Sequence, residues 1–251
     1  MKAIGLIPAR YDSQRLPGKP LVDIGGKTMI QRVWEQTCEC RTLSEVYVVT
    51  DDERIRSAAK AFGADVIMTS SNHRSGTERC GEALHLLGLS SNDVLVNVQG
   101  DEPFLDPANL DRLVARFEES AVRIGTLATR LTDDAFGEEA QSNPNCVKVI
   151  FDHQGMAIYF SRSPLPYRRS KLKGNLGHRH IGVYAFRAGT LRELIELEPS
   201  KLEIQESLEQ LRWIENGYPI AVQLVESKGI TVDTAEDLQA ARAQARDQEQ
   251  A

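Results

Sequence analysis

The sequence predicts an α/β fold with a mostly parallel sheet, and three observations support this prediction. Short apolar runs alternate with helical stretches through the first half of the chain. Several of these runs are apolar throughout, which indicates strands buried on both faces, as in parallel sheets covered by helices. With 251 residues, the chain is long enough for one large domain or for a domain with a small appendage.

The elements of the first half follow in β-α-β-α order, which is typical of a parallel sheet. The helix over 52–62 illustrates the evidence, because Ile55, Ala59 and Phe62 fall at helical spacing and Gly63 can end the helix. The expected strands are 3–7, 45–50, 65–68, 93–99 and 123–129, and the expected helices are 28–39, 52–62, 76–88 and 106–119.

The second half has a different rhythm. We expect a hairpin of strands 146–151 and 156–161, a basic loop over 163–180, a strand over 181–186, and helices over 203–216 and 234–248. In the helix over 203–216, apolar spacing predicts that Ile204, Leu208 and Leu211 face the core. Glu206 and Gln210 lie one turn apart on another face, where they are solvated or bind sugar hydroxyls.

Composition and charge exclude several classes of protein. The contents of 41% hydrophobic and 26% charged residues are ordinary for a globular protein. There is no apolar run long enough for a membrane span and no signal-peptide pattern, so we expect a cytoplasmic protein with no membrane contact. The net charge of −6 argues against nucleic acid as a partner. The four cysteines lack zinc-ligand spacing and are expected to be free thiols.

The stretch LIPARYDSQRLPGKPL, residues 6–21, places three cations on the loop after the first strand. Ligands of open α/β sheets bind beyond the carboxyl ends of strands, where this loop lies. Arg10, Arg15 and Lys19 therefore favour a polyphosphate ligand over a merely solvated basic loop. The loop lacks the Walker A pattern.

Two carboxylates also follow β-like runs. Asp101 lies in VNVQGDEP (96–103) and Asp233 lies in ITVDTAEDL (230–238). Such carboxylates can hold a divalent ion that bridges phosphates, although an Asp at a strand end can equally cap a turn. Thr234 and Asp237 fit a capping box, which leaves Asp233 freer to bind metal.

Two further stretches carry polar side chains whose role the pattern leaves open. SSNHRSGTER (70–79) suits either a helix N-cap or the binding of an anion or a base edge. His178 and His180 are two residues apart on an extended segment, as zinc ligands can be, but no third ligand of suitable spacing is visible.

Seven motifs together resemble one family, the 3-deoxy-manno-octulosonate cytidylyltransferases, also called CMP-Kdo synthetases. They are PARYDSQRLPGKPL, SGTER, NVQGDEP, YFSRSPLPY, RHIGVYAF, ESLEQLR and VDTAEDL, in the order of the family, and they span residues 3 to about 240. The first motif is shared with CMP-sialic acid synthetases, whereas the combination of the third, sixth and seventh narrows the match.

The resemblance implies a three-layer, nucleotide-diphosphosugar-transferase-like fold with a smaller part for sugar binding and dimerisation. It implies a nucleotidyltransferase that converts CTP and 3-deoxy-D-manno-octulosonate (Kdo) into CMP-Kdo and pyrophosphate for lipopolysaccharide biosynthesis, with Mg²⁺ as cofactor and a homodimer as the assembly. It divides the single domain (1–251) into a CTP-binding part (1–145), a sugar-acid-binding and dimerisation part (about 146–232) and a C-terminal helix (233–251).

The resemblance also assigns residues to roles. The catalytic residues would be Arg10, Lys19, Asp101 and Asp233, of which Asp101 and Asp233 bind the metal. The CTP-binding residues would be Pro8, Ala9, Arg10, Arg15, Lys19, Ser75, Gly76 and Thr77. The residues that bind the sugar acid would be Gln99, Arg162, His180, Tyr184, Glu206 and Gln210, with Arg162 or His180 as the cation for the sugar's carboxylate.

Two departures from the family and three alternatives stay open at this point. The segment 168–178 is shorter than in many members, and Ala235 stands where Pro is usual. The alternatives are a synthetase for 8-amino-Kdo or sialic acid, and a non-catalytic nucleotide-binding subunit, which would not need two metal-binding carboxylates. A dinucleotide-dependent oxidoreductase is disfavoured because no G-x-G-x-x-G follows the first strand.

Overall fold

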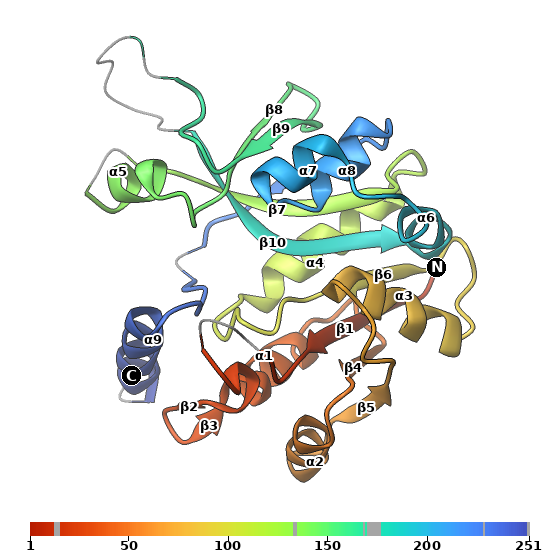
Figure 1. Cartoon of the computed structure of the whole chain (residues 1–251), viewed down its shortest axis with the longest axis vertical. Helices are drawn as coiled ribbons and strands as arrows, with labels where there is room; N and C mark the ends of the chain where they lie inside the picture. Colours follow the sequence, from red (N-terminus) through yellow and green to blue (C-terminus); the bar gives the residue numbers. More distant parts are fainter. Residues whose placement is uncertain (13–15, 133–134, 168, 170–176, 228, 250–251) are drawn as a thin grey trace. The chain divides into compact units, whose positions relative to one another are not determined.

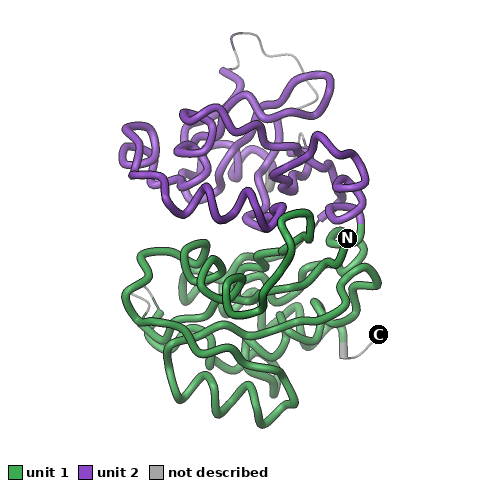
Figure 2. Tube along the Cα trace, turned by 90° about the vertical axis from the view of Figure 1, so that its right-hand side faces the viewer, with its two compact units in different colours: residues 1–111, 228–251 green, residues 112–227 purple. Residues whose placement is uncertain are grey.

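The computed structural model describes residues 1–12, 16–132, 135–167, 169, 177–227 and 229–249 (Figure 1). Two compact units emerge from it: unit 1 comprises residues 1–111 and 228–251, and unit 2 comprises residues 112–227 (Figure 2). The functional parts expected from the sequence remain predictions.

Unit 1 contains a parallel sheet with the strand order β6-β1-β4-β5. The strands are β1 (Ala3–Ala9), β4 (Glu45–Thr50), β5 (Asp65–Met68) and β6 (Val94–Asn97). All of β6 and nearly all of β1 are buried, as their continuous apolar character predicts. The predicted parallel sheet is therefore confirmed, and the loops after β1 and β6 leave the same edge of it.

The helices of unit 1 begin at side-chain caps that the sequence supplies. Thr28, Asp52 and Ser75 accept hydrogen bonds from backbone N–H groups in the first turns of α1, α2 and α3. These helices are α1 (Met29–Cys38), α2 (Glu53–Ala61) and α3 (Gly76–Leu86), and α4 (Pro107–Ala115) follows, ending in a short 3-10 turn. All four agree with the predicted helices within a few residues.

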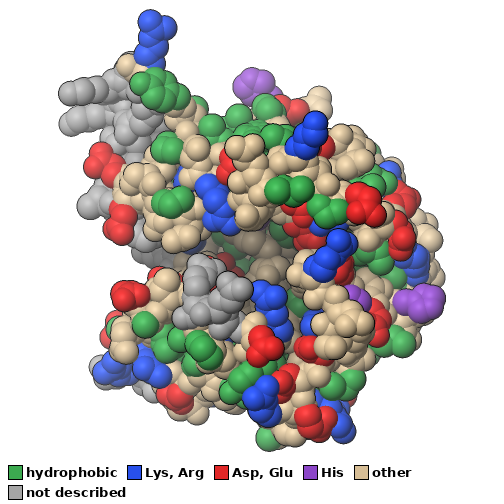
Figure 3. Space-filling view, in the orientation of Figure 1, with side chains coloured by type: hydrophobic (Ala, Val, Ile, Leu, Met, Phe, Trp, Pro, Cys, Tyr) green, Lys and Arg blue, Asp and Glu red, His purple; other side chains and the backbone are tan. Residues whose placement is uncertain are grey.

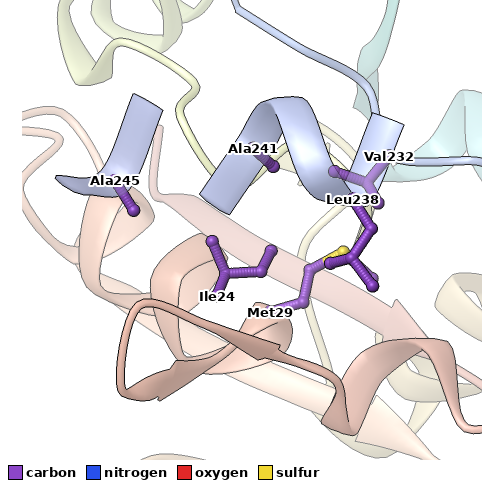
Figure 4. Packing of buried hydrophobic residues seen from close by; sticks show 6 residues of the cluster. All are labelled: Ile24, Met29, Val232, Leu238, Ala241 and Ala245. Carbon is purple, nitrogen blue, oxygen red and sulfur yellow. The ribbon is translucent and has the colours of Figure 1, made fainter. Parts of the chain in front are cut away.

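The C-terminal helix α9 (Ala235–Glu249) packs against the short antiparallel pair β2 (Asp23–Ile24) and β3 (Lys27–Thr28) and the start of α1. Figure 4 shows the small cluster of buried side chains that joins these segments, although they lie far apart in the sequence. The cluster consists of Ile24, Met29, Val232, Leu238, Ala241 and Ala245. It fixes the segment that leads into α9.

Unit 2 contains a mixed sheet. β7 (Ile124–Arg130) lies between β10 (His178–Arg187), which is antiparallel to it, and β11 (Ala221–Leu224), which is parallel to it. The predicted hairpin is confirmed as β8 (Lys148–Phe151) and β9 (Ala157–Ser161), and β8 also pairs with β10. The sequence did not predict β2, β3, β11, α5 (Ala135–Ser142) or α6 (Ala188–Leu194).

The single helix expected over 203–216 is wrong. The structure has α7 (Lys201–Glu206) and α8 (Gln210–Glu215), separated at Ser207, which adopts a left-handed conformation with φ of 51°. Arg162 bonds to the backbone carbonyls of Glu206 and Ser207, and an uninterrupted helix would use those carbonyls internally. A tertiary contact therefore overrides local helix propensity.

Two consequences of this break correct the sequence analysis. Ile204 is 69% exposed and does not face the core, whereas Leu208 and Leu211 are buried as predicted. Glu206 and Gln210 lie at the end of α7 and the start of α8, so they are not one turn apart on one helix.

On the face in Figure 3, Lys and Arg side chains are interspersed with Asp and Glu. None of the helices in the described part of the chain is long and apolar enough to cross a membrane.

Candidate active site

Three charged side chains predicted for the site meet in unit 1. The Lys19 ammonium donates a hydrogen bond of 2.7 Å to Asp101 Oδ2 and one of 2.9 Å to Asp233 Oδ1. The two carboxylate oxygens are therefore separated by no more than the sum of these distances, although the residues lie in distant parts of the sequence. The structure thus brings together three of the four predicted catalytic residues.

The backbone after β1 places Lys19 in this cluster. Gly18 has φ of 68° and its N–H bonds to the Tyr11 carbonyl, and a Cβ at this position would come within 3.2 Å of the Tyr11 side chain. Glycine therefore suits this turn, both for its φ and for the space available. Lys19 then begins a 3-10 turn, Lys19–Leu21, that Pro20 stabilises by fixing φ.

Two hydrogen bonds between residues 231–232 and residues 101–102 hold Asp233 close to Asp101. The Val232 N–H donates to the Asp101 carbonyl at 3.0 Å, and the Thr231 hydroxyl donates to the buried Glu102 carboxylate at 2.7 Å. On the other side of Asp233, Asp237 accepts from its backbone N–H at 3.0 Å and caps α9. The side chain of Asp233 is thus placed by its neighbours on both sides.

The expected capping box at the start of α9 is confirmed. The Asp237 carboxylate accepts from the Thr234 N–H, and the Thr234 hydroxyl accepts from the Asp237 N–H.

Electrostatics hold Lys19 in its charged form. Burial alone lowers the pKa of Lys19, but the charges and hydrogen bonds of Asp101 and Asp233 outweigh it, so the pKa is raised. The side chains of the two aspartates remain about one-quarter exposed. The cluster holds two negative charges and one positive charge in a place that solvent still reaches.

The residues fit a divalent cation. No group of three or more His, Cys, Asp or Glu side chains with metal-ligand geometry occurs among the described residues. The two carboxylates nevertheless converge on one cationic nitrogen, and carboxylate oxygens are the ligands that Mg²⁺ prefers, usually completed by water and substrate phosphates. The convergence on Lys19 shows that the pair can share one cation.

The end of β1 also packs closely on the start of α3 and on the loop after β6. A Cβ on Gly76 would approach the Pro8 ring to 3.1 Å, and a Cβ on Gly100 would approach the Pro8 carbonyl to 3.2 Å. Small residues at both places therefore let the three segments meet. Four of the predicted CTP-binding residues lie at this contact. Pro8 and Gly76 face each other in it, and Ala9 and Thr77 are the next residues along the chain. Thr77 is buried.

Ser75 caps α3 as expected, because its hydroxyl accepts a hydrogen bond from the Glu78 N–H. Arg10 is exposed just beyond β1, and Arg15 lies outside the described residues. Sequence reasoning missed Arg79, which is 4% exposed and pairs with Asp51 at 3.0 Å. Its only sequence signal was its place in the SGTER motif.

In unit 2, hydrogen bonds join the segment around Arg162 to the segment around Glu206. The Glu206 carboxylate accepts from the Ser161 hydroxyl at 2.6 Å and from the Arg162 N–H at 2.9 Å. The Arg162 guanidinium donates to three backbone carbonyls, those of Pro144, Glu206 and Ser207. Because a guanidinium carries five N–H groups, two of them make no hydrogen bond within the described part of the chain.

His180 and Tyr184 form a second pair in unit 2, with ring centroids 5.3 Å apart. Phe160 contacts the His180 ring edge-on at 5.0 Å, and Trp213 contacts Tyr184 in the same way. Burial, aided by Arg179, lowers the pKa of His180 to about 3. His180 is therefore neutral near pH 7, which corrects the expectation that it could supply a cation for the sugar's carboxylate.

The remaining predicted sugar-site residues are polar and little exposed. Gln210 is 5% exposed at the start of α8. Gln99 belongs to unit 1, where its amide donates to the Asn97 side chain at 3.4 Å. The structure thus groups Arg162 with Glu206 and His180 with Tyr184.

The class of protein follows from comparison with known families. Residues 4–227 match the family model described as cytidylyltransferase. A relative named 3-deoxy-manno-octulosonate cytidylyltransferase from Phocaeicola vulgatus is 51% identical, with 98% of this chain and 97% of the relative covered. One of the same name from Parabacteroides distasonis is 49% identical, with 97% and 98% covered. The chain belongs to the family of 3-deoxy-manno-octulosonate cytidylyltransferases.

Solved structures agree with this assignment and with the predicted fold. A structure of CMP:2-keto-3-deoxy-manno-octonic acid synthetase complexed with CTP matches with a TM-score of 0.91 and 40% identity, covering 99% of this chain and all of the other. A 4-diphosphocytidyl-2C-methyl-D-erythritol synthase from Anaerococcus prevotii, at 15% identity and a TM-score of 0.61, shares the fold.

Proposed function

We propose that this nucleotidyltransferase transfers CMP from CTP to the anomeric hydroxyl of Kdo, giving CMP-Kdo and pyrophosphate for lipopolysaccharide biosynthesis. The anomeric oxygen forms a bond to the α-phosphorus, the bond from that phosphorus to the bridging oxygen breaks, and the hydroxyl proton is lost. The observation that carries the proposal is the Lys19, Asp101 and Asp233 cluster beside a parallel sheet, in a chain of this family.

Unit 1 binds the nucleotide in this proposal. Arg10, Arg15 and Lys19 bind the triphosphate and stabilise the leaving pyrophosphate, because phosphoryl-type transfer depends mainly on positioning and charge neutralisation. Pro8, Ala9, Ser75, Gly76 and Thr77 form the cytidine pocket. The close approach of α3 to the end of β1 supports a small base, so we expect cytosine to be preferred over purines.

Asp101 and Asp233 would hold Mg²⁺. Their convergence on the Lys19 ammonium supports this role, since a pair of carboxylates that shares one cation can share another. A bound Mg²⁺ would supply charge neutralisation at the phosphates and activation of the attacking hydroxyl. Lys19 would then have fewer carboxylate contacts and could donate to phosphate oxygens.

Unit 2 binds the sugar acid in this proposal. Two N–H groups of Arg162 are available for the carboxylate of Kdo, and Glu206, Gln210, His180 and Tyr184 offer neutral or anionic hydrogen-bonding groups for its hydroxyls. Gln99, which belongs to unit 1, stays a prediction that the resemblance to the family implies. The names of the relatives favour Kdo over 8-amino-Kdo or sialic acid.

We further propose a homodimer and a cytoplasmic location. The resemblance to the family supports the dimer, because it implies a dimerisation part over about 146–232, most of which lies in unit 2. The cytoplasm supplies CTP, and the free cysteines of the described chain suit a reducing compartment.

A pyrophosphate-release assay tests the function. Each of CTP, UTP, ATP and GTP is combined with Kdo, 8-amino-Kdo and sialic acid, in the presence and absence of Mg²⁺. We expect rapid release with CTP and Kdo, weaker release with UTP, and little with the purine nucleotides. Equal turnover with ATP would contradict the nucleotide assignment, and faster turnover with sialic acid than with Kdo would contradict the sugar assignment.

A further inference from the structure

Strand β10 is irregular beside β7. Ile181 stands opposite Leu127, and Tyr184 stands opposite Thr126, which is the next residue along β7. Residues 182–183 are therefore extra at this point of the ladder and form a bulge. Bulges of this kind re-aim side chains and are common beside functional sites.

The bulge brings two predicted sugar-site residues together. In a regular strand, residues four apart would be separated by about 13 Å. The ring centroids of His180 and Tyr184 are only 5.3 Å apart. The proximity of these two polar aromatic groups therefore depends on the bulge.

The side chain of Thr126 lies at the bulge and contacts it from β7. Its hydroxyl oxygen is 2.8 Å from the Val183 carbonyl, 3.4 Å from the Ile181 carbonyl and 2.9 Å from His180 Nε2. A carbonyl can only accept a hydrogen bond, so the single hydroxyl proton of Thr126 is donated to Val183. The oxygen then accepts a hydrogen bond from His180 Nε2–H.

This contact determines the tautomer of His180. The low pKa makes the imidazole neutral at physiological pH, so it carries one N–H group, and that group is at Nε2. Nδ1 is then a hydrogen-bond acceptor with no partner among the described residues.

We propose that Thr126 is a positioning residue of the sugar-acid site. It holds the bulge of β10 and fixes His180 as the Nε2–H tautomer, so that Nδ1 accepts a hydrogen bond from a hydroxyl group of the sugar acid. The identity of the ligand rests on the proposed function, whereas the tautomer rests on unit 2 alone. His180 thus recognises a hydroxyl, and the carboxylate is left to Arg162.

Nuclear magnetic resonance of the full chain tests the tautomer without any change to Thr126. The protein is labelled with ¹⁵N-histidine, and the His180 signals are assigned by their loss in His180→Gln. We expect long-range ¹H–¹⁵N correlations of a neutral ring with the proton on Nε2 from pH 5 to pH 8. A proton on Nδ1, or a charged ring at pH 6, would overturn the proposal.

Two variants test the positioning role. Thr126→Val keeps the shape but removes the hydroxyl, and Thr126→Ser keeps the hydroxyl. We expect Thr126→Val to raise the KM for the sugar acid about tenfold, the loss of about one hydrogen bond, and to change the KM for CTP by less than about twofold. Thr126→Ser should restore the KM for the sugar acid to within about threefold of the original value.

The outcomes separate this proposal from the proposed function. Equal increases in both KM values, or an unchanged KM for the sugar acid in a folded Thr126→Val protein, would overturn the positioning role. If Thr126→Val fails to fold, the tautomer of the unmodified protein decides. Absence of turnover with Kdo in the unmodified protein would refute the proposed function, while the tautomer would still be observed.

Discussion

Two lysines with little solvent exposure, one in each unit, are held in opposite ways. In unit 1, Lys19 binds two carboxylates, which raise its pKa against the effect of burial. In unit 2, Lys148 is fully buried and donates to the backbone carbonyls of Asn143, Cys146 and Arg162 at 2.6–2.9 Å, and burial lowers its pKa.

The partners of the two lysines differ, and this difference indicates that one lysine acts in catalysis and the other stabilises the fold. The partners of Lys19 are themselves charged and about one-quarter exposed, so they can exchange one cation for another. The partners of Lys148 are carbonyls of the segments around β8 and β9. Without the ammonium, the carbonyls of Cys146 and Arg162 would lose a donor, whereas that of Asn143 would keep the Cys146 N–H. We therefore expect Lys19 to control turnover and Lys148 to control stability.

The largest effect should come from Lys19→Met. Removing a cation from a transferring triphosphate typically costs several kcal/mol of transition-state stabilisation, so we expect kcat to fall about a thousandfold. The melting temperature should change by less than about 4 °C, since partly exposed ion pairs contribute little to stability. Lys27→Met, which removes an exposed ion pair with Glu35, is the matched control and should leave kcat unchanged.

Pyrophosphate release and thermal unfolding measure the two quantities. A Lys19→Met protein with near-normal kcat would mean that Lys19 only neutralises the carboxylates.

Lys148→Met should have the opposite effect. The fully buried ammonium and its three hydrogen bonds to carbonyls would be lost, and we expect the free energy of unfolding to fall by about 3 kcal/mol, measured by urea denaturation. Lys201→Met, at an exposed position in α7, should change it by less than about 0.5 kcal/mol. A loss below about 1 kcal/mol for Lys148→Met would contradict the structural role of Lys148, because the carbonyls would then have found other partners.

The smallest effect concerns pH. His180 has a lowered pKa in the folded state, about 3, against its ordinary 6.5 in the unfolded state. Below pH 6.5 the unfolded chain therefore binds a proton at this site that the folded protein does not. Folding stability from this group is complete above pH 6.5 and is lost as the pH falls towards 3.

At pH 5 the loss should be about 2 kcal/mol relative to pH 7. Urea denaturation of the parent protein and of His180→Asn at both values measures it, and the pH dependence should be smaller in the variant by this amount. An identical pH dependence in both proteins would show that the imbalance in proton binding arises elsewhere.

The two units also differ in how far the sequence predicts them. In unit 1, continuous apolar strands, capping residues and the loop after β1 predicted the parallel sheet and the edge at which Lys19 and Asp101 meet. Asp233 was expected at a strand end by the same argument, but residues 229–233 form no strand. The backbone hydrogen bond from Val232 to Asp101 places Asp233 there instead, and the sequence did not predict it. Charged residues at strand ends are visible in a sequence because topology alone brings them together.

In unit 2, the decisive features are irregularities of the backbone. The break at Ser207 arises from contacts with Arg162, which is distant in sequence, and the bulge of β10 arises from its pairing with β7. RHIGVYAF is typical of a regular strand, and QESLEQL is typical of a continuous helix. Local patterns therefore did not predict how the residues of unit 2 are arranged, nor that His180 is neutral.

The account depends most on the shared role of Asp101 and Asp233, and a double-mutant cycle with Mg²⁺ titration tests it directly. Asp101→Asn, Asp233→Asn and the double variant are compared with the parent protein by pyrophosphate release from CTP and Kdo. If both carboxylates hold the same Mg²⁺ site, each single variant should lose more than about a hundredfold in kcat, and the double variant should lose little more than either. Single variants that keep near-normal turnover and Mg²⁺ dependence, or two losses that simply multiply, would contradict a shared site.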